Sequence, residues 1–306
     1  MLLTRRQLIA LIILTLCWGA NWPVMKLALI QMTPLYYRAV TMGGGALILA
    51  LYLLYKGYSL KLSKGDVIKV LILTIPNILF WHTFSIFGVG ELASGRASIL
   101  GFTMPIWTVL LSAIILKQRL NARLCLSIVV VAIAIGLLSY NEWSHLSGRP
   151  MGIIWMQVAA ISWALGTVLF KKLKPAAPIE VAAVWMLAIG AFFITFVALA
   201  YEPTPEWHTY NAQTWFTVFY GLVINFAVAQ LIWFSMVNAL TPATSALSIM
   251  SVPLVSLFSS MIIMKEIPHT EDYIAVICII IAIANTVFVK KPEILTPANQ
   301  NAPPQK

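Results

Sequence analysis

Charged residues are scarce in this sequence. Asp, Glu, Lys and Arg make up 10% of the 306 residues, whereas 60% are hydrophobic. A soluble domain averages about 25% charged and about 45–50% apolar residues. A chain this apolar cannot hide its nonpolar surface inside a soluble fold of the same size. The composition therefore excludes a soluble globular protein and predicts an integral membrane protein.

Cysteine is also rare. Cys17, Cys125 and Cys278 each stand alone in an apolar run, so their spacing gives neither a disulfide framework nor a metal site. We therefore expect no metal and no cofactor. The formal net charge of +10 would suit a nucleic-acid-binding protein. In a membrane protein, however, basic residues mark the cytoplasmic loops, so we expect no nucleic-acid partner.

Ten stretches are long and apolar enough to cross a bilayer, which takes about 20 residues of helix. They lie at residues 8–32, 35–55, 67–90, 95–116, 123–141, 151–170, 179–201, 214–237, 243–264 and 273–289. The first is interpreted as a retained span rather than a signal peptide. The tail, residues 292–306, is rich in Pro, Asn and Gln and is expected to be disordered.

Basic residues are distributed unevenly between the two sides of these spans. With the amino terminus placed inside, Arg96, Arg149 and Lys265 lie in outer segments, and Lys26 and Arg38 lie at or within outer helix ends. The other 15 lie in inner segments: Arg5, Arg6, Lys56, Lys61, Lys64, Lys69, Lys117, Arg119, Arg123, Lys171, Lys172, Lys174, Lys290, Lys291 and Lys306. Because basic residues favour the cytoplasmic side, we expect a multi-pass protein of the inner (plasma) membrane with both termini, and hence the tail, in the cytoplasm.

The second half of the chain repeats the first. Residues 77–117 align without a gap on residues 225–265. The alignment pairs Asn77 with Asn225, His82 with Gln230, Pro105 with Pro253, Ser112 with Ser260 and Lys117 with Lys265, and further upstream Trp18 falls on Trp163. Each copy holds five spans, an odd number, so the second enters the membrane from the opposite side. We predict an all-α fold of ten helices in two inverted five-helix repeats, residues 1–146 and 147–291, a plan common in secondary transporters.

Several short motifs accompany this repeat. They are Trp18-Gly19 with Lys26, Pro34 and Arg38; Ser94-Gly95-Arg96-Ala97-Ser98 before Pro105; and Met264-Lys265-Glu266. Over nearly the whole chain they resemble the EamA-type members of the drug/metabolite transporter superfamily. The resemblance implies ten helices around a central cavity and the export of amino acids or other small metabolites. One position departs from the family pattern: Gln118 stands where a Glu is usual, while Glu266 keeps the Glu in the second half.

Polar and aromatic side chains within the spans are the candidates for substrate binding, because polar groups in a bilayer must face the bundle or a wet cavity. The predicted set is Trp18, Asn21, Trp22, Asn77, Trp81, His82, Trp163, Asn225, Gln230, Trp233 and Ser248. An aromatic lining would suit an aromatic or cationic ligand. The alternative for these residues is helix–helix packing and hydrogen bonding.

Two further features concern mechanism. Pro105 and Pro253 each remove a backbone hydrogen bond and are predicted hinges in the fourth and ninth helices. No Asp or Glu lies in the middle of a predicted span, which favours movement down a gradient over ion coupling.

The sequence as a whole therefore predicts a secondary transporter rather than an enzyme. We expect a monomer or weak oligomer whose partners are a small-molecule substrate and membrane lipid. The alternatives are a multidrug or cation efflux carrier and, from a different class, a membrane-embedded enzyme.

Overall fold

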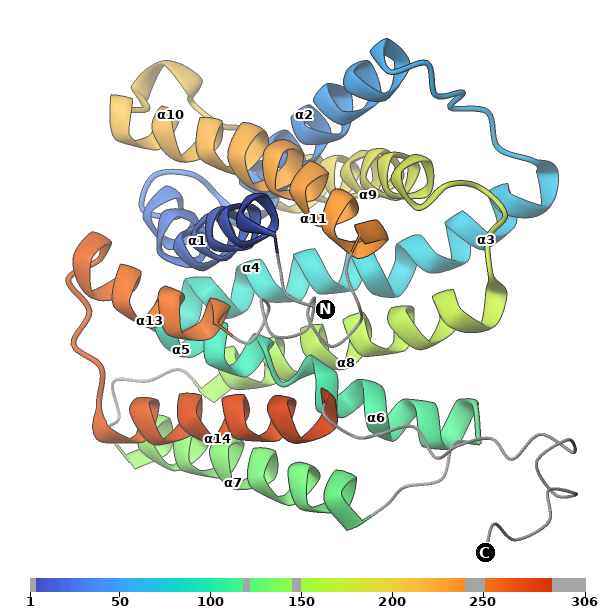
Figure 1. Cartoon of the computed structure of the whole chain (residues 1–306). Coiled ribbons are helices and arrows are strands. Elements are labelled where there is room, and N and C mark those ends of the chain that lie inside the picture. Colours follow the sequence, from blue (N-terminus) through green and yellow to red (C-terminus); the bar gives the residue numbers. More distant parts are fainter. Residues whose placement is uncertain (1–3, 118–121, 145–149, 240–250, 288–306) are drawn as a thin grey trace, which may run out of the picture.

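The computed structural model describes residues 4–117, 122–144, 150–239 and 251–287 (Figure 1). The helices in these ranges are α1 (Arg5–Ala28), α2 (Pro34–Tyr55), α3 (Lys64–Thr74), η1 (Ile75–Phe80), α4 (Trp81–Glu91), α5 (Ser94–Gly101), α6 (Met104–Ile115), α7 (Ala122–Ser144), α8 (Pro150–Leu173), α9 (Ile179–Tyr201), η2 (Trp207–Thr209), α10 (Ala212–Phe219), η3 (Tyr220–Val228), α11 (Ala229–Ala239), α13 (Val252–Ile263) and α14 (Thr270–Val287).

The described helices form ten consecutive units, of which α13 is the shortest with 12 described residues. The π-helical segments η1 and η3 continue their neighbours, so α3–η1–α4 and α10–η3–α11 are single units, and two residues separate α5 from α6. Seven of the described helices are long and apolar enough to cross a membrane, and the shorter helices Leu124–Tyr140 and Val252–Ile263 are also apolar. The predicted fold class is confirmed. Residues 243–250 of the predicted ninth span lie outside the described residues.

Local sequence explains where several of these helices begin. Thr4 caps α1: its hydroxyl accepts from the backbone N–H of Gln7 at 3.3 Å, while the Gln7 side chain accepts from Thr4 N–H at 3.0 Å. Pro34 opens α2, where its missing N–H leaves no helical bond unmade. Once begun, α1 stays helical through Pro23. The helix ends therefore follow from a few polar residues and prolines placed between apolar runs.

The repeat predicted from the sequence recurs in the backbone. Asn77 lies in the π-helical segment η1, and its counterpart Asn225 lies in the π-helical segment η3. Lys117 and its counterpart Lys265 both have positive φ angles, 52° and 57°, at the ends of α6 and α13. Deviations from regular helix thus occur at equivalent places in the two halves, which regular apolar helices alone would not produce.

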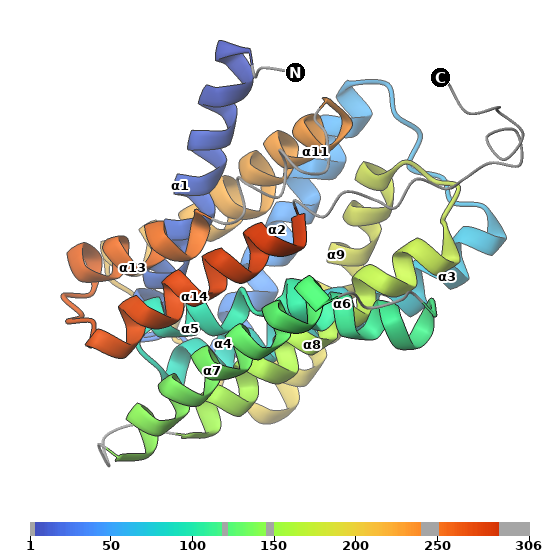
Figure 2. The same ribbon diagram turned by 60° about the horizontal axis from the view of Figure 1, so that its bottom comes forward.

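The two halves interlock rather than stand side by side. The most extensive helix contacts join α2 with α9, α7 with α14, α4 with α8 and α1 with α13, and each of these pairs takes one helix from either half. Figures 1 and 2 both show α7 and α14 running alongside each other at one edge of the bundle. The predicted boundary between residues 146 and 147 lies outside the described residues.

Candidate functional site

Two tryptophan pairs join the halves on corresponding helices, α1 with α11 and α8 with α4. Trp18 on α1 meets Trp233 on α11 with ring centroids 5.4 Å apart. Trp163 on α8, the repeat counterpart of Trp18, meets Trp81 on α4 at 5.3 Å. All four side chains are half-buried. The pairs place aromatic surface, part of it accessible, along the contact between the two repeats.

The two repeat-related asparagines lie in the π-helical segments beside these pairs. Asn77 and Asn225 are each 8% exposed, and among the described residues neither amide has a hydrogen-bond partner. The amide of Asn77 contacts Gly166 on α8, where any side chain would collide with it. Single π-helical turns are frequent at functional sites because they change the direction of side chains and loosen the helical bonding. Two unpaired amides at equivalent positions are groups that a bound molecule could satisfy.

The side chain of His82 points towards η3 rather than towards α8. Its ring lies 5.2 Å from the ring of Phe226 in η3, whereas its neighbour Trp81 turns towards α8. The guanidinium carbon of Arg38 on α2 lies 5.9 Å from the centroid of the same Phe226 ring. Nδ1 of His82 and Nε of Arg38 are both buried, and neither has a hydrogen-bond partner in the part of the chain that the structure describes. A second cluster, Arg38, His82 and Phe226, therefore extends the site from α4 to α2 and η3.

The sequence did not identify Arg38 or Phe226 as site residues. Arg38 was assigned to an outer helix end, although a charged residue four positions after Pro34 in an apolar span is itself a signal of function. Phe226 carried no such signal, because apolar aromatics fill the spans and only the fold brings this one against His82.

The remaining predicted residues fall into three groups. Trp22 is 6% exposed, with its ring 6.5 Å from that of Phe102, so it packs in the core rather than at an open surface. Asn21 and Gln230 are half-buried and make no hydrogen bond to described residues. Ser248 lies outside the described residues.

The predicted hinge residues both stand in the first turn of a helix, Pro105 in α6 and Pro253 in α13. Before Pro105 the helix is broken between α5 and α6. Gln157 of α8 fills this break: its amide oxygen accepts from Trp107 Nε1 at 3.0 Å and from the Thr103 hydroxyl at 3.3 Å. Its amide nitrogen lies 3.4 Å from the carbonyl oxygen of Leu100. The break is thus held by a polar side chain of the other half.

Two acidic side chains of the second repeat bind the start of α5 at one end of the bundle. The carboxylate of Glu266, after α13, accepts from the backbone N–H groups of Ser94 and Gly95 at 2.7 and 3.2 Å and caps α5. Two residues further on, Arg96 makes a two-pronged ion pair with Asp272 of α14, at 2.7 and 3.0 Å, and both residues are buried. We call these four contacts, two from Glu266 to the start of α5 and two between Arg96 and Asp272, the clasp. It joins the first repeat to the second.

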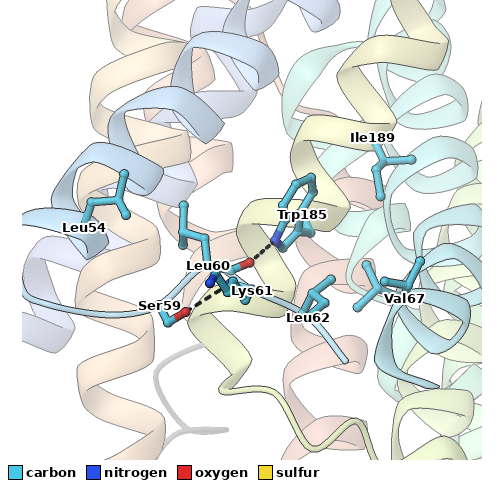
Figure 3. Close-up of a pocket in the computed structure, with 9 residues that line it drawn as sticks. Leu54, Ser59, Leu60, Lys61, Leu62, Val67, Trp185 and Ile189 are labelled. Carbon is cyan, nitrogen blue, oxygen red and sulfur yellow. Dashed lines mark hydrogen bonds between the residues drawn. The ribbon is translucent and has the colours of Figure 1, made fainter. Parts of the chain in front are cut away.

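A pocket of about 550 Å³ lies beside the loop that joins α2 to α3 (Figure 3). Its lining is mostly apolar and consists of Leu54, Ser59, Leu60, Lys61, Leu62, Val67, Val70, Trp185 and Ile189. The indole N–H of Trp185 donates to the carbonyl of Leu60 at 2.8 Å and ties the loop to α9. None of the predicted binding residues that the structure describes lines this pocket, so it is not the site that the sequence predicted.

Ten helices in two inverted repeats, with amides and aromatic rings along their contact, define a membrane protein of the inverted-repeat transporter class. The chain belongs to the EamA-like transporter family, whose pattern matches residues 5–140 and again residues 150–288.

Several transporters are similar in sequence. "Uncharacterized transporter YoaV" of Bacillus subtilis (strain 168) is 25% identical over 83% of this chain and 87% of its own. "Uncharacterized transporter YvbV" of the same organism is 25% identical over 90% and 89%. "Uncharacterized inner membrane transporter YedA" of Escherichia coli (strain K12) is 27% identical over 63% and 62%.

One solved structure, described as "Crystal structure of protein", superposes with a TM-score of 0.61 at 18% identity. The superposition covers 90% of this chain and 95% of that one. At this identity the likeness concerns the fold alone.

Proposed function

We propose that the protein is a secondary transporter that exports small metabolites, amino acids or related compounds, by alternating access. The observation that carries the proposal is the pair of unpaired amides, Asn77 and Asn225, in equivalent π-helical segments where the two repeats meet. A solute held between two inverted repeats can face one side of the membrane or the other as the repeats exchange conformations. The substrate leaves unchanged, so no catalytic group is assigned.

The half-buried tryptophan pairs support a site for an organic solute. Trp18 with Trp233 and Trp81 with Trp163 offer ring faces against which an apolar or aromatic portion of the solute can stack. Ring faces also attract cations, which favours the second candidate function, efflux of lipophilic cations. The buried positive charge of Arg38, 5.9 Å from the Phe226 ring, opposes it because like charges repel at short range.

We further propose that the protein lies in the inner membrane with both termini in the cytoplasm. The excess of basic residues in the segments assigned to the inside supports this orientation. In this orientation the clasp lies on the outer side. Export then requires the clasp to open.

Flux into liposomes tests the transport proposal. Purified protein is reconstituted, the vesicles are loaded with one unlabelled amino acid at a time, and exchange with the labelled compound is measured. Tetraphenylphosphonium serves as the lipophilic cation. We expect exchange for at least one amino acid. In the same assay, Asn77→Ala and Asn225→Ala should exchange more slowly. Their folded yield should stay near normal, because one amide hydrogen bond is worth on the order of 1 kcal/mol in a membrane.

Asn285→Ala is the matched control. The Asn285 amide already donates to the hydroxyl of Ser127 at 3.0 Å, between α14 and α7. Its removal should lower thermal stability but leave exchange per folded molecule unchanged. Exchange of tetraphenylphosphonium alone would favour the cation carrier, and normal exchange in both site variants would show that the asparagines do not form the site.

A further inference from the structure

Arg38 is a buried cation that forms no ion pair with any residue that the structure describes. It is 3% exposed and lies in the fifth position of α2, about 6 Å along the helix axis from its start. Its Nη2 lies 2.8 Å from the sulfur of Met25, and its guanidinium faces the ring of Phe226 at 5.9 Å. Nε has no partner, and no carboxylate of the described residues forms an ion pair with it.

The same chain shows how a buried arginine is otherwise satisfied. Arg96 is 5% exposed and donates to both carboxylate oxygens of Asp272, at 2.7 and 3.0 Å. A thioether sulfur and a ring face are weak substitutes for a carboxylate, and an uncompensated charge in a low-dielectric interior is costly. The planar guanidinium of Arg38 therefore has the geometry to bind a carboxylate from outside the chain.

The surroundings of Arg38 favour one kind of ligand. His82 packs against the same Phe226 ring as Arg38. Its buried Nδ1 has no hydrogen-bond partner among the described residues and can donate to or accept from a bound group. Trp81 adjoins His82 with ring centroids 6.5 Å apart, and Trp163 follows at 5.3 Å. A molecule that places an anionic end at Arg38 would extend its apolar end towards these indole rings.

We propose that Arg38 binds the carboxylate of the transported compound, with His82 as a second polar contact. The substrate class is carboxylic acids with an apolar or aromatic side group, amino acids among them. This inference rests on the proposed transport function and adds to it the chemical group that the site recognises.

Acid and amide pairs test the inference. The probes are the common amino acids, benzoate and the matching carboxamides, each added to the purified protein while its thermal unfolding is followed, and each then assayed for exchange in liposomes. We expect at least one acid, but not its carboxamide, to stabilise the protein and to be exchanged. Arg38→Gln should weaken the binding of that acid about ten- to hundredfold, because hydrogen bonds to charged groups are the strong ones. The affinity of Arg38→Lys for that acid should lie between those of the parent and Arg38→Gln, because lysine keeps the charge but not the planar guanidinium.

The melting temperature of the unliganded protein separates a binding role of Arg38 from a structural role, because the two roles predict changes in opposite directions. Removing an unpaired buried charge should leave the melting temperature of Arg38→Gln unchanged or raised, whereas Arg96→Gln, which breaks a buried ion pair, should lower it. A fall in Arg38→Gln as large as that in Arg96→Gln would assign Arg38 to packing and overturn the inference.

The outcomes separate this inference from the transport proposal. Equal stabilisation by an acid and its carboxamide, or exchange of neutral and cationic probes only, would overturn the carboxylate site and leave transport intact. The absence of both stabilisation and exchange for every probe would overturn both.

Discussion

Replacing Asp272 by Asn removes the carboxylate that balances Arg96 in the clasp. Both residues are buried, the guanidinium is held at 2.7 and 3.0 Å, and the Asp272 carboxylate also accepts from the backbone N–H of His269 at 2.8 Å. Asn keeps the size of the side chain and can still accept from His269, so the perturbation is the loss of one negative charge. We expect the variant to be less stable and to favour the conformation in which the clasp is open.

The size of the effect follows from burial. Breaking a buried ion pair by neutralising one partner costs about 3–5 kcal/mol, because the other charge stays in a poorly solvating interior. If the clasp forms in one conformation only, a loss of about 3 kcal/mol from that conformation changes the ratio of the two by roughly a hundredfold. Replacing both partners by apolar residues, Arg96→Met with Asp272→Leu, should restore most of the stability, since well-packed apolar pairs often equal buried ion pairs. It should also return the ratio of the two conformations towards that of the parent, because the apolar pair packs only in the conformation where the ion pair formed.

Distances between spin labels measure the two conformations directly. Labels at Ala93 and Ile267, which is 86% exposed, lie on either side of the clasp, and the three native cysteines are replaced by serine. We expect a short distance in the parent and in the double variant and a longer one in Asp272→Asn, with a lower melting temperature in Asp272→Asn alone. An Asp272→Asn variant with the distance distribution of the parent would refute the reasoning, because the ion pair would then contribute to stability without biasing the conformation.

Three further predictions concern topology, coupling and hinge motion. Reporter fusions after Lys61 and after Lys174 should both report cytoplasm, as the distribution of basic residues requires; a periplasmic signal at either site would contradict the orientation. Flux should persist without a pH or sodium gradient, because no carboxylate lies in the middle of a predicted span; strict dependence on an imposed proton gradient would point instead to His82. Pro105→Ala and Pro253→Ala should slow the exchange between open states more than they weaken substrate binding, since proline disfavours the continuation of a helix across its position and alanine does not; exchange at the parent rate, measured by the same labels, would leave rigid-body motion of the repeats as the mechanism.

The sequence determined the helices and the repeat better than it determined what the helices present to one another. Apolar runs and paired prolines locate the spans, because lipid forces every spanning segment to be helical. The alignment of Asn77 with Asn225 also predicted that the two residues would occupy equivalent places, and both lie in π-helical segments. The π-helical geometry itself was not predicted, since hydrophobic periodicity assumes a regular helix.

The site was harder to predict because its neighbours come from distant parts of the chain. Trp22 and Trp18 share one apolar helix, yet Trp22 is buried against Phe102 whereas Trp18 is half-buried against Trp233. Nothing in the local pattern distinguishes them. Arg38 likewise counted as one more basic residue near a helix end until the fold placed it beside Phe226. Burial and partnership depend on the other half of the molecule, which local spacing does not reveal.

The interlocking of the two halves has a consequence for how the protein is made. The chain emerges from its amino terminus, and α1, α2, α4 and α7 each find their most extensive contacts on helices that follow later, namely α13, α9, α8 and α14. During synthesis the first five helical units therefore wait in the bilayer with polar groups such as Arg38 exposed to lipid or to provisional neighbours. Contacts between distant parts of a chain also form slowly, because long loops must close first. Expression of the two halves as separate polypeptides should then yield neither half in a stable form alone, while co-expression should allow each to complete the other.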